Sequence, residues 1–187
     1  KGLSDDGGLF LPKQIKKLSD KEFLNLRNLS YVDLATKIIS RFTGDFCSNE
    51  KLHQIVKKSY STFNEHNVVK IKKIEDLHVL ELFHGPTLAF KDVAMQLIGN
   101  FYEYYLSKNT KKINIIVATS GDTGAAAIDA VKGKKNINIF VLHPNNRISP
   151  VQRMLMTTNP SKNVFNIAVE GNFDDCQKLV KEMFSDI

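Results

Sequence analysis

The sequence has only two cysteines among its 187 residues, Cys47 and Cys176. They lie far apart along the chain, and neither has neighbours at a spacing typical of a metal site, so no metal is predicted. A secreted scaffold held by disulfides is not indicated, and a reducing, cytoplasmic compartment is the simpler interpretation. Each cysteine is expected to behave as a small apolar residue rather than as a nucleophile.

The sequence also lacks an apolar run long enough to cross a bilayer, and it does not open with a secretion leader. Its first residues, Lys1 to Asp6, are typical of the interior of a longer polypeptide. Hydrophobic residues make up 42% and charged residues 25% of the chain, as in ordinary globular proteins. We therefore expect a globular protein with no membrane partner.

A concentrated basic stripe is absent too, although the formal net charge is +6. The lysine pairs are spread over the whole chain, and no interleaved aromatic residues accompany them. They are Lys16-Lys17, Lys57-Lys58, Lys72-Lys73, Lys111-Lys112 and Lys134-Lys135. Such pairs are typical of solvated surfaces and loop ends, so no nucleic-acid partner is predicted.

The first part of the chain, residues 1–76, is predicted to be a helical segment with a glycine-rich lead-in. Leu9, Phe10 and Leu11 are expected to pin the lead-in, residues 2–12, to a core. Three helices are predicted after it. Each begins with a serine that can cap the helix, at Ser19, Ser30 and Ser48, and apolar residues then recur at helical spacing.

The second part, residues 77–187, alternates between short strands and helices. The expected strands are 78–83, 113–118, 137–142 and 164–169, and the expected helices are 92–106, 125–131, one starting after Ser149, and 173–184. Strands joined by single helices run parallel. The fold class is therefore α/β, with an open, mostly parallel, doubly wound sheet that binds ligands beyond the carboxyl ends of its strands. So few strands indicate an incomplete sheet.

A candidate reactive lysine, Lys91, ends the segment His84-Gly85-Pro86-Thr87-Leu88-Ala89-Phe90-Lys91, and Asp92 follows it. A strand is expected to end at Phe83, and a helix is expected to start at Asp92. A cation is electrostatically misplaced at a helix N-terminus, so its position requires a reason. Burial of its stem would favour the neutral amine, which attacks carbonyl groups to form imines. A plain surface lysine is the alternative.

A candidate anion-binding loop follows the expected strand 113–118. It consists of Ser120, Gly121, Asp122, Thr123 and Gly124. Backbone N–H groups at a helix N-terminus receive anions, and the glycines let a ligand approach closely. An ordinary helix cap is the alternative, and no P-loop lysine follows. At consecutive strand ends of one parallel sheet, the two sites would place an imine-forming lysine opposite an anion-binding loop.

Four motifs in the sequence carry a family resemblance. They are DDGGLFLP (5–12), ELFHGPTLAFKD (81–92), ATSGDTGAAA (118–127) and ISPVQ (148–152), with weaker similarity in EGNFDDCQKLV (170–180). In these motifs the chain resembles the threonine synthases, which are pyridoxal-phosphate enzymes of fold type II. The resemblance covers nearly the whole chain, and HGPTLAFKD together with SGDTGAA is highly specific.

The resemblance implies that Lys91 is the Schiff-base lysine for pyridoxal 5'-phosphate. It also implies that Phe90 and Asp92 flank the cofactor, with the loop Ser120–Gly124 against cofactor and substrate. The implied reaction converts O-phospho-L-homoserine and water to L-threonine and phosphate, in amino-acid biosynthesis. Lys91 would remove the Cα proton while the cofactor ring takes up the electrons. The implied protein is a cytoplasmic monomer or homodimer.

Three further residues have open roles. His84 is either an acid near the leaving phosphate or a turn residue bonded to the backbone. Asp92 is expected to cap the helix or orient Lys91 rather than to abstract protons. Arg147 is either a phosphate ligand or a surface arginine.

The family's second glycine-rich loop, which holds the cofactor phosphate, has no match in the sequence. Its later polar residue at the pyridine nitrogen has no match either. The chain is therefore expected to be the N-terminal part of a threonine synthase and to be inactive when isolated. Two alternatives remain, a related phospho-lyase that makes no threonine and a truncated protein that only binds.

Overall fold

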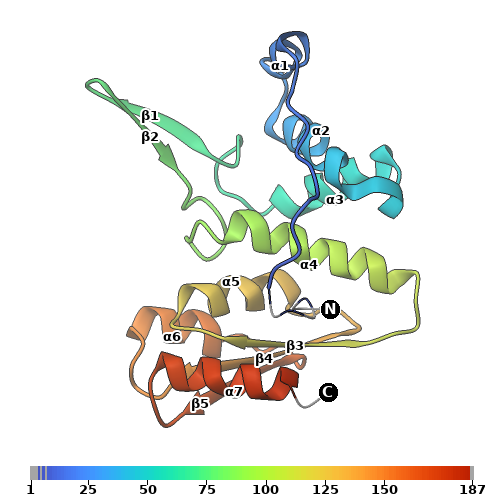
Figure 1. Ribbon diagram of the computed structural model, residues 1–187. Helices are drawn as coiled ribbons and strands as arrows, with labels where there is room; N and C mark the ends of the chain where they lie inside the picture. Colours follow the sequence, from blue (N-terminus) through green and yellow to red (C-terminus); the bar gives the residue numbers. More distant parts are fainter. Residues whose placement is uncertain (1–3, 5, 7, 186–187) are drawn as a thin grey trace. The chain divides into compact units, whose positions relative to one another are not determined.

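The computed structural model describes residues 4, 6 and 8–185 of the chain (Figure 1). The chain divides into two compact units, residues 1–54 and 55–187. The functional division expected at residues 76 and 77 stays a prediction.

The first unit is helical, as predicted. Its elements are α1 (Asp20–Leu26), α2 (Tyr31–Thr43), the short 3-10 helix η1 (Gly44–Phe46) and the start of α3 (Asn49–Tyr60). The hydroxyl of Ser19 accepts a hydrogen bond from the Glu22 N–H, and the hydroxyl of Ser30 accepts one from the Asp33 N–H. These bonds satisfy N–H groups that the first turn of a helix leaves unpaired.

The lead-in differs from the expectation. Leu9, Phe10 and Leu11 are 78%, 67% and 81% exposed, so they do not pin the segment to a core in the described structure. The carboxylate of Asp6 instead accepts hydrogen bonds from the Ser4 hydroxyl and the Gly8 N–H, at 2.5 and 2.9 Å. The other two residues of the opening DDGG, Asp5 and Gly7, lie outside the described residues.

The second unit contains the predicted parallel sheet. The sheet and the helices that follow its strands are β3 (Ile113–Ala118), α5 (Asp122–Val131), β4 (Ile137–Pro144), α6 (Pro150–Thr157), β5 (Val164–Val169) and α7 (Phe173–Ser185). The strand order is β3-β4-β5, with both pairs parallel. Helices α5 and α6 lie on one side of the sheet and α7 on the other (Figure 1), which is the doubly wound arrangement expected for an α/β fold.

The core of this unit lies between the central strand β4 and helix α5. Ile139 and Val141 of β4 are fully buried, and Ile128 of α5 is 1% exposed. Helix α5 is rich in alanine, and Ala125, Ala126 and Ala130 are all buried. Small side chains on the helix let it approach the sheet closely, because no bulky groups keep the two apart.

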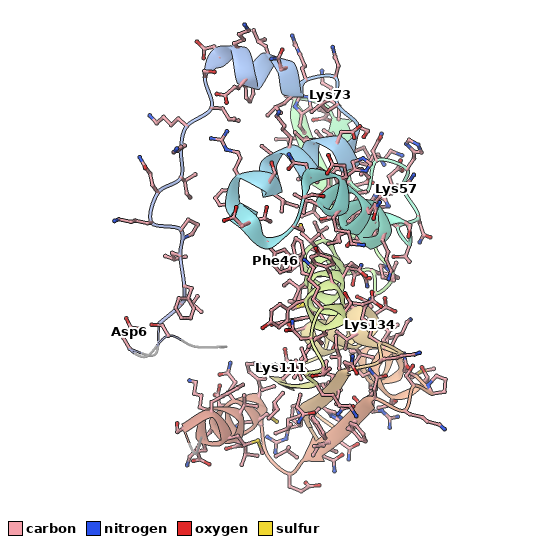
Figure 2. The ribbon with its side chains drawn as sticks, turned by 90° about the vertical axis from the view of Figure 1, so that its right-hand side faces the viewer. Asp6, Phe46, Lys57, Lys73, Lys111 and Lys134 are labelled. Carbon is pink, nitrogen blue, oxygen red and sulfur yellow. The ribbon has the colours of Figure 1, made fainter. Side chains whose placement is uncertain are left out.

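The strand expected at residues 78–83 does not belong to the parallel sheet. It is β2 (Leu77–Glu81), and it pairs antiparallel with β1 (Lys70–Ile74) as a separate hairpin. Only the last of its ten residues, Glu81, is not exposed, and Lys73 marks the hairpin in Figure 2. The prediction that Lys91 follows a strand of the parallel sheet was therefore wrong.

Helix α4 (Asp92–Ser107) connects the hairpin to β3 and packs on α5. At their contact, a Cβ atom added to Gly99 would overlap the carbonyl oxygen of Ala130. Farther along, the side-chain amide of Gln96 donates a 2.7 Å hydrogen bond to the carboxylate of Asp129. Because residue 99 has no side chain, the backbones of the two helices can approach each other closely at this point.

A charged cluster holds the last turns of α4. Lys134, labelled in Figure 2, donates to the carbonyl oxygen of the Asn100 side chain and to the carboxylate of Glu103, at 2.9 and 2.8 Å. Lys58 of α3 reaches the same carboxylate at 2.6 Å. Partial burial alone raises the pKa of Glu103, but the bonds to Lys134 and Lys58 outweigh it and hold that pKa below its ordinary value.

We predict that Gly99→Ala lowers the free energy of unfolding by about 1–3 kcal/mol, because the added methyl group overpacks the α4–α5 contact. At an exposed helix position, Gly→Ala would raise the free energy of unfolding by nearly 1 kcal/mol. A decrease would therefore show that residue 99 is in close contact with α5. Urea denaturation followed by far-ultraviolet circular dichroism measures it, since the chain has no tryptophan. Ser107→Ala, exposed on the same helix, is the control and should change stability by less than about 0.5 kcal/mol.

Candidate active site

The chain reaches Lys91 through a series of tight turns. The N–H of Leu88 donates to the Gly85 carbonyl at 3.1 Å, and the N–H of Asp92 donates to the Ala89 carbonyl at 3.0 Å. Leu88 has a φ of 60°, a conformation that costs a non-glycine residue energy. Lys91 is the N-cap residue of α4, in helical conformation. Its position is thus fixed by the helix start and not by a strand end.

A buried carboxylate holds these turns in place. Asp92 is fully buried, and its two oxygens accept hydrogen bonds from the N–H and the hydroxyl of Thr87, at 2.8 and 2.6 Å. A Cβ atom added to Gly85 would lie 2.5 Å from the Cβ atom of Asp92. Asp92 therefore binds Thr87 in the segment that carries Lys91, and its expected role of orienting Lys91 stays a prediction.

The glycine loop after β3 is organised by Thr119, which belongs to the motif 118–127 but had no predicted role of its own. Thr119 is 1% exposed, and its hydroxyl oxygen accepts hydrogen bonds from the N–H groups of Gly121 and Gly124, at 2.9 and 2.8 Å. Two of the N–H groups expected to bind an anion are therefore used inside the protein. The signal available in the sequence was a threonine directly after an expected strand and two residues before a glycine.

Helix α5 still presents donors at its start. The N–H groups of Asp122 and Thr123, in its first turn, have no acceptor within the helix. Ser120 is exposed and Thr123 is partly buried. Gly121 has a φ of 142°, which L residues rarely adopt. The loop can thus receive an anion through fewer backbone groups than its glycine content suggested.

The two predicted sites meet at the carboxyl edge of the sheet. The Lys91 amine lies 3.9 Å from a carboxylate oxygen of Asp122 and 4.9 Å from the centre of the Phe90 ring. The Lys91 side chain is 28% exposed and that of Asp122 is 48% exposed. An ion pair this accessible to water is weak. The Lys91 side chain is therefore partly buried and only weakly paired with Asp122.

Another contact joins this site to α6. The side-chain amide of Gln152 donates a 2.7 Å hydrogen bond to the other carboxylate oxygen of Asp122. Gln152 belongs to the family motif 148–152, but no site role is predicted for it from the sequence. Periodicity cannot show such a contact, because it depends on how α5 and α6 pack side by side.

The remaining candidates are less closely tied to the site. The His84 ring lies 3.0 Å from the Glu81 carboxylate and 4.7 Å from the Phe83 ring centre, so it belongs to the end of the hairpin. Arg147 is exposed after β4. Cys176 is fully buried, and burial, with a smaller effect of the Asp175 carboxylate, raises the pKa of its thiol. A buried neutral thiol is a poor nucleophile.

Other classes of site are not found in the described part of the chain. Its histidine, cysteine and acidic residues form no group of three that could hold a metal ion. Among residues 4, 6 and 8–185, no helix is long and apolar enough to cross a membrane.

Comparison with known proteins gives a consistent result. Residues 1–60 match the family model described as "Threonine synthase N terminus". The chain is 42% identical to the threonine synthase of Eremothecium gossypii, covering 99% of this chain and 39% of that protein. It is 37% identical to "Threonine synthase-like 2" of Mus musculus, covering all of this chain and 39% of that protein.

Comparison of the fold with solved structures indicates the same relatives. The crystal structure of PLP-bound threonine synthase from Brucella melitensis matches with a TM-score of 0.91 and 45% identity, over 100% of this chain and 40% of that one. The chain spans about two fifths of the length of the curated relatives it matches. By sequence and by fold, the chain belongs to the threonine synthase family and corresponds to the N-terminal part of its members.

Proposed function

We propose that the whole protein of which this chain forms the N-terminal part is a threonine synthase. It would convert O-phospho-L-homoserine and water to L-threonine and phosphate. The observation that carries this proposal is the half-buried Lys91 amine, 3.9 Å from Asp122 at the carboxyl edge of a parallel sheet. Ligands of such sheets bind at this edge.

The residues of the site fit pyridoxal 5'-phosphate. Lys91 offers an accessible primary amine, and Phe90, 60% exposed, offers an aromatic face beside it. The start of α5 offers free N–H donors to an anionic group. Lys91 would hold the cofactor through its amine, with Ser120–Gly124 against it. When bound, the cofactor supplies an electron sink for negative charge at the substrate α carbon.

Lys91 is the proton carrier of the proposed reaction. Its amine would take the proton from the substrate Cα, pass it on, and then take one from Cβ, so that the phosphate leaves Cγ with the bonding electrons. The two protons would return to Cγ and Cα, and water would add its hydroxyl at Cβ. An amine in this role must alternate between its neutral and protonated forms. The Asp122 carboxylate lies 3.9 Å from this amine. Because the pair is open to water, the attraction between the two groups is weak.

Asp92 is not available as a base in this scheme. It is fully buried, and Thr87 donates to both of its oxygens. We assign it the role of holding the segment 85–91, so that the side chain of Lys91 extends from the helix start in a single direction. It would act on the cofactor only through the neighbouring lysine.

A second candidate is a related phospho-lyase that releases phosphate without making threonine. The 37% identity to "Threonine synthase-like 2" of Mus musculus supports this second candidate. Product analysis with O-phospho-L-homoserine separates the two, because only a threonine synthase adds water at Cβ. A cytoplasmic location and a monomeric or homodimeric state belong to the same proposal.

We predict that Lys91→Ala in the full-length protein abolishes covalent uptake of the cofactor and lowers kcat by about 10²- to 10⁴-fold, because the proton carrier is lost. Incubation with pyridoxal phosphate, borohydride reduction and peptide mapping should place the cofactor mass on Lys91 in the unchanged protein. Lys178→Ala, an exposed lysine of α7, is the control and should retain both properties. Label spread over surface lysines would rule the proposal out.

We predict that Asp92→Asn lowers the free energy of unfolding by about 1.5–3 kcal/mol. The amide group can accept from only one of the two Thr87 donors and turns its own N–H toward the other, and bonds to a buried charge are costly to lose. Thermal or urea denaturation of the full-length protein measures the change. Asp174→Asn, at an exposed position in the first turn of α7, is the matched control. Equal stabilities of the two variants would contradict the assigned role.

A further inference from the structure

We propose that Gln152 of α6 is a positioning residue that holds the Asp122 carboxylate beside the Lys91 amine. The inference rests on the proposed function for its catalytic meaning, but its structural part stands on contacts alone. Asp122 needs such support, because its side chain is 48% exposed and 3.9 Å from Lys91. A solvated ion pair of this kind does not fix the orientation of a carboxylate.

The amide of Gln152 has only one orientation that satisfies its neighbours. A carboxylate accepts hydrogen bonds and cannot donate them, so the group that faces Asp122 at 2.7 Å is the NH₂ of Gln152. The carbonyl oxygen of the amide then faces the hydroxyl of Ser149, which donates to it at 3.0 Å. The direction of the whole relay from Ser149 to Asp122 is therefore determined.

Gln152 is itself fixed at both ends. Its backbone N–H donates to the Ser149 hydroxyl at 3.2 Å, as the cap of α6. Its side-chain amide lies directly against Gly121, since a Cβ atom added to that glycine would overlap the amide carbon. The absence of a side chain at residue 121 thus makes room for the amide, and the positive φ of 142° adds a second reason for glycine there.

These contacts connect helix α6 to the reactive amine. Ser149 orients Gln152, Gln152 orients Asp122, and Asp122 faces Lys91. A residue outside the two reactive motifs therefore determines where the counter-charge of the lysine lies. Changing Gln152 should leave the fold intact, because the residue is only partly buried, and should loosen Asp122.

The test uses zero-length crosslinking of the cofactor-free full-length protein with a water-soluble carbodiimide. This reagent joins an amine to a carboxylate that it touches, and peptide mapping measures the Lys91–Asp122 amide. The Lys58–Glu103 pair, at 2.6 Å, serves as the internal reference and also reports that each variant is folded. Gln152→Leu and Gln152→Glu remove the donated hydrogen bond, and Arg153→Gln, an exposed neighbour on α6, is the control.

We expect both Gln152 variants to lower the yield of the Lys91–Asp122 amide, relative to the reference pair, by about 3- to 10-fold, the net value of one hydrogen bond. Arg153→Gln should not change it. In the active holoenzyme kcat should fall by a similar factor while KM is retained. A yield that is unchanged in both Gln152 variants overturns the inference. A lower yield in a full-length protein that makes no threonine supports the positioning role and overturns the proposed function instead.

Discussion

The contact between α4 and α5 determines where the reactive groups of this chain meet. Both helices begin at the candidate site, α4 with Lys91 at its N-cap and α5 with Asp122 as its first residue. The strand that precedes α4 belongs to a separate hairpin, so it does not tie Lys91 to the sheet. The close approach at Gly99 and the bond from Gln96 to Asp129 provide the alternative connection. The distance from Lys91 to Asp122 therefore depends on helix packing.

The position of Lys91 at a helix start also resolves an electrostatic difficulty. The N-terminus of a helix carries a partial positive charge that repels a cation. The negative charge of Asp122 and the face of the Phe90 ring both lie near the amine, and each offsets part of that repulsion. The Asp92 carboxylate is close in sequence, but its oxygens are engaged by Thr87. The counter-charge thus comes from another helix, where a third helix, α6, can adjust it.

Much of this arrangement could be predicted from the sequence. The features that could not be predicted all depend on contacts between distant parts of the chain. Strand β3 has the expected bounds, and β5 has them too, because apolar runs between turn residues specify a strand. The motif around Lys91 was also recognised, but the pairing predicted for the strand before it was wrong. The residues of β2 resemble a buried strand locally, whereas the pairing of a strand depends on where the chain turns. The antiparallel turn at Glu75, with a φ of 52°, has no glycine to indicate it.

Thr119 and Gln152 lie in motifs found in the sequence, but their roles depend on contacts that only the folded structure shows. Thr119 turns two glycine N–H groups inward, which restricts the conformations of the loop. The remaining donors of the loop lie in the first turn of α5. Gln152 then lies over the same loop from α6. A loop rich in glycine would otherwise have many conformations, and fixing it on binding would cost free energy. Packing from two sides lowers this cost in advance, as the proposed function requires of a site that must hold an amine and its counter-charge within a few ångströms.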